Sequence, residues 1–273
     1  MIQRIQLNYF VGVLLLTTLG ACGQVQAQTT LGASSLAMGQ TGVAVPNTNW
    51  SLFFNVAMMP TDGNRVSFYG FRYVGISEIT DMAANLTTQT SWGTLGAGIH
   101  RYGFNLFNEN RFLLAYKNNL DRFYYGASVS YTHIFQGGDY GAAGAVGFDL
   151  GLAAEITDDL WFGARATNLN QPSYGDTDEE LPRELATGLS YMLTPEALVT
   201  AEIVKDVMFP ISFRSGIQFE IIQSLFIRAG ITTQPETYSF GFGYKSSRWD
   251  VNFALQQHNP LGLSPALDLA VKF

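Results

Sequence analysis

The chain has 273 residues, of which 14% are charged and 14% are aromatic, and its formal net charge is −7. Soluble proteins carry roughly 25% charged residues, and nucleic-acid-binding domains present a basic face, so this composition is atypical of a soluble protein and argues against a nucleic-acid partner. The mean hydropathy of +0.09 is too low for a bundle of membrane helices, but it suits a barrel in which only alternate residues face lipid.

The first 27 residues have the features of an export signal. Arg4 is the only charge before an apolar run at residues 9–19, which is too short for a membrane helix of about 20 residues. Val25-Gln26-Ala27 fits a cleavage site with small residues. A second interpretation stays open, because Leu19-Gly20-Ala21-Cys22 resembles a lipobox in which Cys22 would be lipidated. Cys22 is the only cysteine, so the mature chain is expected to contain no disulfide and no thiolate metal site.

The next segment, residues 28–63, shows no strict alternation of polar and apolar residues. It is rich in Gly and Ala and has some helical spacing. From residue 64 to the last residue the pattern changes to a period of two, which places alternate side chains on opposite faces of a sheet. We therefore divide the chain into a signal peptide (1–27), an N-terminal plug segment (28–63) and a transmembrane barrel (64–273).

The alternation predicts about fourteen antiparallel strands and an all-β fold. Residues 143–156 illustrate it, because Val146, Phe148 and Leu150 share one face while Gly147 and Asp149 share the other. The clearest strands are predicted at 123–135, 143–156, 211–221, 225–232, 249–256 and 266–273. Weaker patterns predict strands at 65–73, 82–89, 95–102, 111–117, 160–168, 184–192, 197–206 and 238–245.

The connections between these strands alternate in length. Tight turns are predicted at 91–93, 118–121, 157–159, 194–196, 223–224 and 246–247. Longer links are predicted at 103–109, 136–142, 170–182, 233–236 and 258–264, with a short exception at 207–210. Short periplasmic turns opposite longer external loops are typical of outer-membrane barrels, and an even strand number places both chain ends in the periplasm. We expect the barrel to close by pairing residues 64–73 with 266–273.

A soluble β-sandwich would also show alternating strands, with charged residues on its outer face. Here the polar face carries many Gly, Ala and Ser, while the other face is rich in Phe, Tyr and Trp. This favours a transmembrane antiparallel β-barrel embedded in outer-membrane lipid. Aromatic residues near the predicted strand ends are expected to anchor the barrel at the lipid interface: Trp161, Tyr191, Tyr238, Trp249 and Phe273.

The start of the mature chain resembles a known family. Residues 32–45 read GASSLAMGQTGVAV, which is similar to the opening of FadL-like barrels and most similar to the PorV/PorQ branch, whose opening reads G-A-R-x-L-x-M-G-x-A-x-V-A. That branch follows it with N-P-A-G-L, and Asn55-Val56-Ala57-Met58-Met59 stands here, with Val56 and Met58 replacing Pro and Gly. Phe273, at the end of an alternating strand, resembles the terminal signal for barrel assembly.

The resemblance implies that the N-terminal segment folds inward as a plug. The residues that carry this expectation are Gly32, Ala33, Leu36, Met38, Gly39, Gly42 and Asn55. It also implies a function in the outer membrane. A PorV/PorQ-type barrel would support type IX protein secretion or surface attachment, with secretion-system components as partners. The alternative is a FadL-like channel for the uptake of small hydrophobic molecules.

The sequence contains no motif of a hydrolase, a zinc enzyme or a phosphate-binding loop, so we predict neither an enzyme nor a cofactor or metal site. Charged residues do occur at positions whose parity faces the lumen: Asp149, Glu155, Arg165, Glu202, Arg214, Glu220, Arg228, Lys245, Asp250 and Asp268. Two interpretations stay open, namely ion pairs that tie the wall to the plug and a charged constriction that selects permeants. Arg214 and Arg228 could face Glu220 or Glu202.

The plug segment also contains large apolar residues, for which two interpretations again stay open. They either pack against the inner wall or line a pocket for a hydrophobic ligand: Leu36, Met38, Trp50, Phe53 and Phe54.

Overall fold

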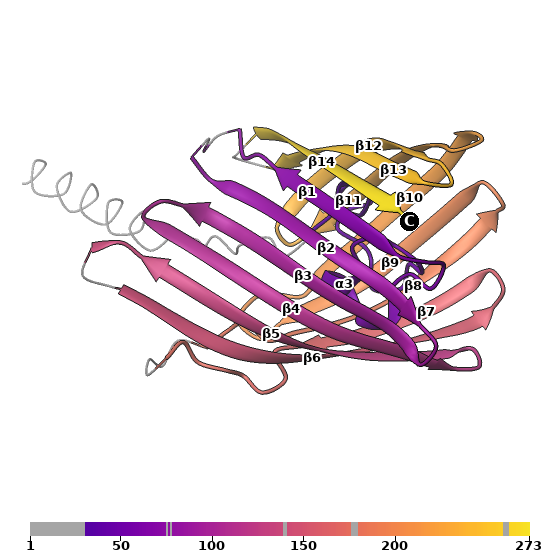
Figure 1. Cartoon of the computed structure of the whole chain (residues 1–273). Coiled ribbons are helices and arrows are strands. Elements are labelled where there is room, and N and C mark those ends of the chain that lie inside the picture. Colours follow the sequence, from indigo (N-terminus) through magenta and orange to yellow (C-terminus); the bar gives the residue numbers. More distant parts are fainter. Residues whose placement is uncertain (1–30, 75, 77, 139–140, 176–179, 259–261) are drawn as a thin grey trace, which may run out of the picture.

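The computed structural model describes residues 31–273 except for 75, 77, 139–140, 176–179 and 259–261. Fourteen antiparallel strands close into one barrel (Figure 1), which confirms the predicted fold class. The strands are β1 (Arg65–Phe71), β2 (Thr80–Thr90), β3 (Gly93–Phe104), β4 (Phe107–Leu120), β5 (Phe123–Gln136), β6 (Gly141–Thr157), β7 (Leu160–Thr167), β8 (Glu184–Thr194), β9 (Ala197–Asp206), β10 (Ser212–Ile222), β11 (Leu225–Thr233), β12 (Glu236–Lys245), β13 (Trp249–His258) and β14 (Gly262–Lys272).

The first strand and the last strand complete the ring. β1 pairs with β14 over its whole length, from Arg65 opposite Lys272 to Phe71 opposite Ala266. The expected pairing between the two ends of the barrel domain is thereby confirmed. Closure leaves no unpaired sheet edge between β1 and β14, which removes the template that an open sheet would offer for aggregation.

Side chains alternate between an apolar exterior and a buried interior along the strands. On β6, for example, Phe148 and Leu150 are each 51% exposed, whereas the intervening Asp149 is 7% exposed. A wide belt of exposed apolar side chains would be unfavourable in water but is the expected surface in contact with lipid. The protein is therefore a transmembrane barrel of the cell outer membrane.

The two rims of the barrel differ less than the sequence indicated. Short turns join the strands at one rim, as expected, and both the start of β1 and the end of β14 lie there. We call the opposite rim, which carries the β1–β2 link, the long-loop rim. Two of the long links predicted there, 103–109 and 233–236, are wrong, because only two residues separate β3 from β4 and only two separate β11 from β12. Polar residues such as Arg101 and Asn110 continue the ladder there as a cross-strand pair.

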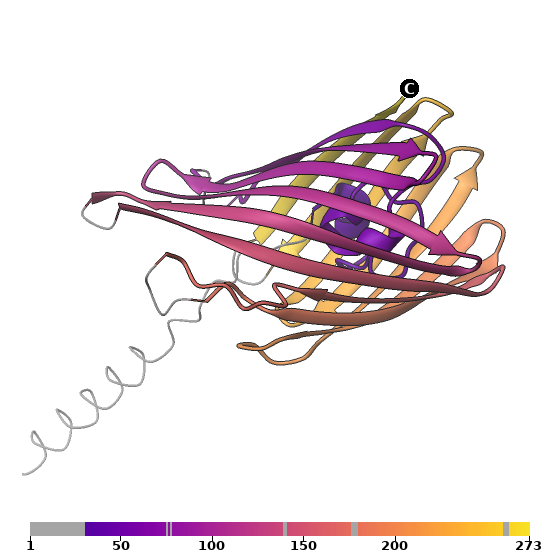
Figure 2. The ribbon, with the colours of Figure 1, turned by 60° about the horizontal axis from the view of Figure 1, so that its bottom comes forward.

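The barrel wall is higher on one side than on the other, as Figures 1 and 2 show. β6 has 17 residues, whereas the next strand, β7, has only 8. The first residues of β6, before Leu150, have no partner in β7. Residues 168–175 run beside them: the Leu169 N–H donates to the Phe148 carbonyl at 2.9 Å, and the Gly175 N–H donates to the Gly144 carbonyl at 3.2 Å. Residues 168–175 thus cover this part of the β6 edge.

Before the barrel, the described chain contains two short helices, α2 (Ala33–Ala37) and α3 (Ser51–Phe54), and a 3-10 turn, η1 (Val56–Met58). Figure 2 shows them within the ring of strands. None of the helices in the described part of the chain is long and apolar enough to cross a membrane. The predicted signal peptide, residues 1–27, and the question of Cys22 lipidation lie outside the described residues.

One of the predicted interface anchors is wrong. Trp161 packs toward the lumen, with its ring 5.2 Å from that of Tyr124, next to Ala44, Ala57 and Met58. The reason is its parity, because the neighbouring Phe162 takes the outward position of β7 and is 38% exposed.

Candidate functional site

The candidate site is the lumen, where residues 31–60 meet the inner wall. The first contact is made by α2, whose N-terminal backbone is held by a wall carboxylate. Asp268 of β14 is 1% exposed, and its Oδ2 accepts hydrogen bonds from the N–H groups of Ala33 (2.6 Å) and Ser34 (3.4 Å). The first N–H groups of a helix have no partner within the helix, so Asp268 satisfies donors that the helix itself leaves open. Asn252 donates to the other oxygen of Asp268 at 2.8 Å.

A second carboxylate holds the chain just after α2. Glu202 of β9 accepts hydrogen bonds at Oε1 from the N–H groups of Gly42 (2.6 Å) and Val43 (2.7 Å). Its cross-strand neighbour is Arg214, which donates to the Gln40 carbonyl at 3.2 Å. An opposite-charge pair on adjacent strands therefore binds both the donors and the acceptors of one backbone turn.

The third attachment surrounds α3 and η1. Arg165 of β7 donates to the carbonyls of Phe53 (3.3 Å) and Phe54 (3.0 Å) and forms an ion pair with Glu184 of β8. Asn55 is fully buried; it donates to the carbonyls of Val43 (2.7 Å) and Leu152 (3.0 Å), and its own oxygen accepts from the Ala57 N–H. Asn55 thus joins two parts of the segment to the wall, which explains why an amide suits this position.

The segment approaches the wall closely where the wall lacks side chains. A Cβ added at Gly230 would lie 2.0 Å from the Gly39 nitrogen, and one added at Gly163 would lie 2.0 Å from the Val43 carbonyl oxygen. Gly39 itself has a φ of 69°, a region that glycine adopts at little cost. The wall glycines therefore make room for the segment's backbone.

Of the other charged residues at lumen-facing positions, Asp250 also binds the segment, and the rest contact wall residues or turns. Asp149 accepts hydrogen bonds from Arg111 (2.9 Å), Ser128 (3.0 Å) and the Asn168 N–H (2.9 Å), and it fixes the start of the β7–β8 link. The contacts of the remaining five are as follows: Glu155 lies 4.0 Å from Arg122, Glu220 accepts from the Ser224 N–H, Arg228 donates to Gln218 and Asn252, Asp250 accepts from Asn49, and Lys245 pairs in register with Asp250.

These positions bear on the two interpretations of the lumen charges. Asp268, Glu202, Arg214, Arg165 and Asp250 bind residues 31–60 directly. Arg214 stands opposite Glu202, and Arg228 stands opposite Gln218 rather than a carboxylate. The arrangement resembles an attachment of the segment more than a ring of charges around an open pore.

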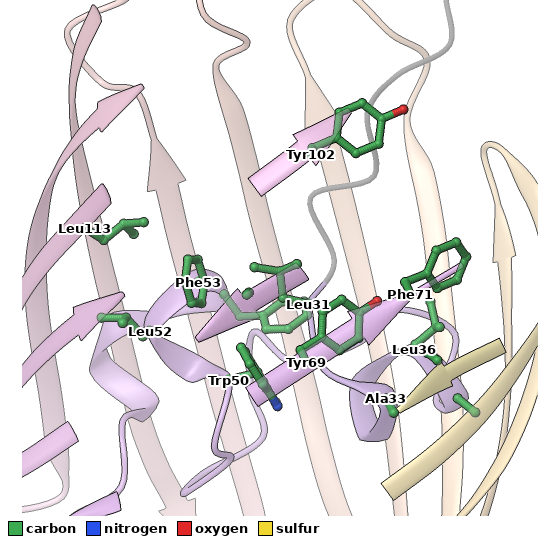
Figure 3. Close-up of a cluster of buried hydrophobic side chains, with 14 of the residues drawn as sticks. Leu31, Ala33, Leu36, Trp50, Leu52, Phe53, Tyr69, Phe71, Tyr102 and Leu113 are labelled. Atoms are coloured by element: carbon green, nitrogen blue, oxygen red, sulfur yellow. The ribbon is translucent and has the colours of Figure 1, made fainter. Parts of the chain in front are cut away.

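On the side of the segment that faces the long-loop rim, aromatic side chains lie on the inner face of β1 and its neighbours (Figure 3). Trp50 packs edge-on against Tyr69, with ring centroids 5.5 Å apart. Phe71 packs against Tyr73 at 4.6 Å, and Tyr73 faces Tyr102 of β3 at 6.2 Å. We call these five residues the aromatic ladder. It extends from the N-terminal segment toward the rim that carries the β1–β2 link.

On the opposite side of the segment, toward the rim of short turns, lies a cavity of about 230 Å³, which we call the lower cavity. Its lining is mixed. Arg228, Lys245 and Asp250 contribute charge, whereas Met38 and Trp161 contribute apolar surface. Residues 31–60 therefore lie between the packed aromatic ladder and a more polar cavity.

The sequence did not reveal all contacts of the segment. Uncharged and basic wall residues also bind its backbone: Ser190 donates to Ala44 (2.7 Å), Thr232 donates to Gly39 (2.8 Å) and Lys117 donates to Met59. The alternation of the sequence predicts that these wall residues point inward, but it does not predict which backbone groups they bind. The ladder could have been found, because Tyr69, Phe71 and Tyr73 occupy alternate positions of one predicted strand.

No protein-family model matches the chain, and no curated protein matches its sequence significantly. Solved structures are nevertheless similar. The Ralstonia pickettii toluene transporter TbuX gives a TM-score of 0.68 at 16% identity, covering 89% of this chain and 98% of that chain. The monoaromatic hydrocarbon channel CymD gives 0.68 at 13% identity, covering 90% and 98%. A Pseudomonas aeruginosa FadL homologue gives 0.59 at 11% identity, covering 89% and 98%. At these identities the likeness concerns the fold: the chain has the barrel fold of FadL-family outer-membrane transporters.

Proposed function

We propose that this barrel is a channel through which small hydrophobic molecules cross the outer membrane. The observation that carries the proposal is the aromatic ladder, a group of buried rings inside the barrel that begins at the N-terminal segment and continues toward the long-loop rim. Ligand sites for apolar molecules are concave and lined by hydrophobic and aromatic side chains. The similar structures named above include proteins described as toluene or monoaromatic hydrocarbon transporters, which supports this function over the secretion role that the sequence favoured.

The ladder suits an apolar permeant for a physical reason. Transfer of apolar surface out of water is favourable, and ring faces offer stacking and edge contacts worth about 0.5–1.5 kcal/mol each. In this proposal a ligand displaces the packed rings in turn and exchanges contact with one ring for contact with the next, without entering water. The small hydrophobic ligand is thus the partner we assign to the lumen.

We further propose that the segment predicted as a plug, residues 28–63, acts as one in its described part. Its polar attachments are hydrogen bonds to individual wall residues, such as Asp268 or Glu202. Such bonds contribute about 0.5–3 kcal/mol each, so separate parts of the segment can detach without unfolding the barrel. A permeant that reaches Trp50 then needs only a local rearrangement to proceed.

The test replaces one ring of the ladder and one matched ring outside the lumen. Phe71→Ala removes an inward ring of β1, whereas Phe68→Ala removes an outward ring of the same strand, which is 53% exposed. Uptake of radiolabelled toluene is measured in cells whose own hydrophobic-compound channels are deleted. We expect Phe71→Ala to lower uptake about two- to tenfold, in proportion to one aromatic contact, and Phe68→Ala to leave it unchanged.

Both variants must first show the heat-modifiable gel mobility of a folded barrel. Equal uptake in the two folded variants would contradict the proposal, as would uptake in the parent protein no higher than in cells without the barrel.

A PorV/PorQ-type role in protein secretion is the second candidate, and the opening at residues 32–45 is the observation that favours it. It predicts that the barrel can be crosslinked in its native membrane to a secreted protein bearing a type IX sorting domain. Failure to recover such a protein, in a host that secretes them, would remove this candidate.

A further inference from the structure

The outer face of the barrel contains a depression that the proposed channel does not use. It has a volume of about 550 Å³ and lies over β7 to β11. Apolar side chains form most of its walls, among them Phe162, Leu189, Ile203, Phe213 and Ile231. Since these side chains point away from the lumen, the depression opens toward the lipid.

Cross-strand pairing explains the shape of the depression. In one row across four strands, Leu189 pairs with Ala201, Ala201 with Ser215, and Ser215 with Ile231. Two small side chains thus stand between two large ones. Thr187 of β8, one outward position nearer the long-loop rim, continues the series of small side chains diagonally.

Two basic residues, Lys205 and Arg183, lie beyond the residues that line the depression, on the side of the long-loop rim. Lys205 is exposed on the outward face of β9, one outward position beyond Ile203. Arg183 immediately precedes β8, and its carbonyl accepts the Val207 N–H at 3.0 Å, which places it beside the end of β9. Lys205 donates one hydrogen bond to the Phe209 carbonyl, and an ammonium group has three donors.

Two acidic residues that the structure describes at this end of β8 and β9 point into the barrel and not toward the lipid. Glu184 and Asp206 are buried at inward positions. Glu236 at the start of β12 accepts the hydroxyl hydrogen of Tyr238 at 2.7 Å. The exposed ammonium group of Lys205 therefore lies on the same outward face as the apolar side chains that line the depression.

We propose that this depression binds one acyl chain of lipid A, with a phosphate of its headgroup held by Lys205 and Arg183. A phosphate-bearing acylated lipid combines the anionic group and the hydrocarbon chain that this surface complements. The long-loop rim faces the cell exterior in outer-membrane barrels, so the headgroup comes from the outer leaflet, where lipid A is the phosphorylated lipid.

The test counts lipids bound to the full mature barrel by native mass spectrometry. The barrel is reconstituted in phosphatidylcholine nanodiscs that contain either lipid A or phosphatidylglycerol. Ala201→Leu fills the depression from an exposed position, and Lys205→Glu reverses the charge at its end. Ala127→Leu makes the same addition at an exposed outward position of β5, outside the depression.

We expect one lipid A to remain on the parent barrel and on Ala127→Leu, and its retention to fall about tenfold in Ala201→Leu and in Lys205→Glu. All variants are first shown to be folded by heat-modifiable mobility. Equal retention in Ala201→Leu and Ala127→Leu would overturn the site. Equal retention of phosphatidylglycerol and lipid A by the parent barrel would overturn the assignment of the lipid.

Discussion

At the scale of single residues, the wall glycines determine how closely the N-terminal segment can approach the barrel. At Gly230 an added Cβ would lie 2.0 Å from the Gly39 nitrogen and 2.1 Å from the Met38 carbonyl carbon. Overpacking of this kind costs about 1–3 kcal/mol. Displacing the segment relieves it, whereas the barrel strands are fixed by their hydrogen-bonded neighbours.

We therefore predict that Gly230→Ala displaces residues 38–42 and raises the ion conductance of the barrel in planar bilayers. The control is Gly70→Ala on β1, where an added Cβ meets nothing within 4 Å. Gly70→Ala should leave conductance unchanged. Identical conductance in the two variants would show that the segment tolerates the methyl group in place.

Asp62, in the link before β1, connects the two ends of the barrel domain. It forms ion pairs with Arg65 and, at 3.0 Å, with Lys272. Partial burial raises the pKa of this carboxyl, but the hydrogen bond from Lys272 and the charge of Arg65 outweigh it, so the pKa lies below its ordinary value of 3.8. A carboxyl whose pKa is lowered by folding stabilises the folded state above the unfolded pKa, and this stabilisation is lost as the pH falls through the folded pKa.

We predict that Asp62→Asn lowers the stability of the barrel at neutral pH by about 0.2–1 kcal/mol, the usual range for exposed ion pairs. The difference from the parent protein should shrink as the pH falls below about 4. Urea unfolding in lipid vesicles at several pH values measures both. A difference that does not change between neutral and acidic pH would contradict the assigned ion pairs.

At the scale of elements, the sequence predicted the strands because lipid and lumen impose opposite demands on alternate residues. Phe148 and Asp149 could be assigned to opposite faces from that rule alone, and the structure agrees. The lengths of the links could not be derived, since polar residues such as Asn108 and Asn110 extend β4 as readily as they would form a loop.

The contacts of the candidate site were less predictable than its faces. Parity placed Arg214 and Glu202 inside, but the partner of Arg214 is the Gln40 carbonyl, about 170 positions away in the chain. Such a pairing depends on where a segment without periodicity folds, and no pattern in the sequence encodes that position.

The two faces of β10 provide a test at this scale. Ile217 is 45% exposed on the lipid side, and the adjacent Gln218 borders the lower cavity. We predict that Ile217→Arg destabilises the barrel by about 2–4 kcal/mol, the cost of Arg at mid-membrane. Gln218→Arg should cost less, although it meets Arg228 across the strand pair. Refolding into lipid vesicles measures both, and equal costs would reject the assignment of the faces.

At the scale of the whole molecule, the barrel and residues 31–60 are complementary parts. The inner wall has small side chains and carboxylates. The segment has apolar residues and N–H groups that find no partner within the segment and bind those carboxylates. Leu36, Phe53 and Phe54 are each at most 6% exposed, and full burial of such a side chain contributes about 1.5–3 kcal/mol. These contributions are large enough to hold a short segment in the lumen. The barrel itself is held by the hydrogen bonds between its neighbouring strands.

Because the strands bind one another and the segment binds only to their inner face, we predict that the barrel can form without the segment. Deleting residues 32–60 should leave a folded barrel with higher ion conductance, because the deletion removes the buried residues that fill the lumen beside the cavity of about 230 Å³. Single-channel recording in planar bilayers measures the change, and heat-modifiable gel mobility establishes that the deleted variant is folded. Glu202→Gln serves as the matched control, since it weakens the attachment at Gly42 and Val43 while keeping the whole segment. We expect brief openings in Glu202→Gln and a permanently raised conductance in the deletion. An unchanged conductance in a folded deletion variant would mean that residues 32–60 do not obstruct the pore, and the proposed plug would have to be abandoned.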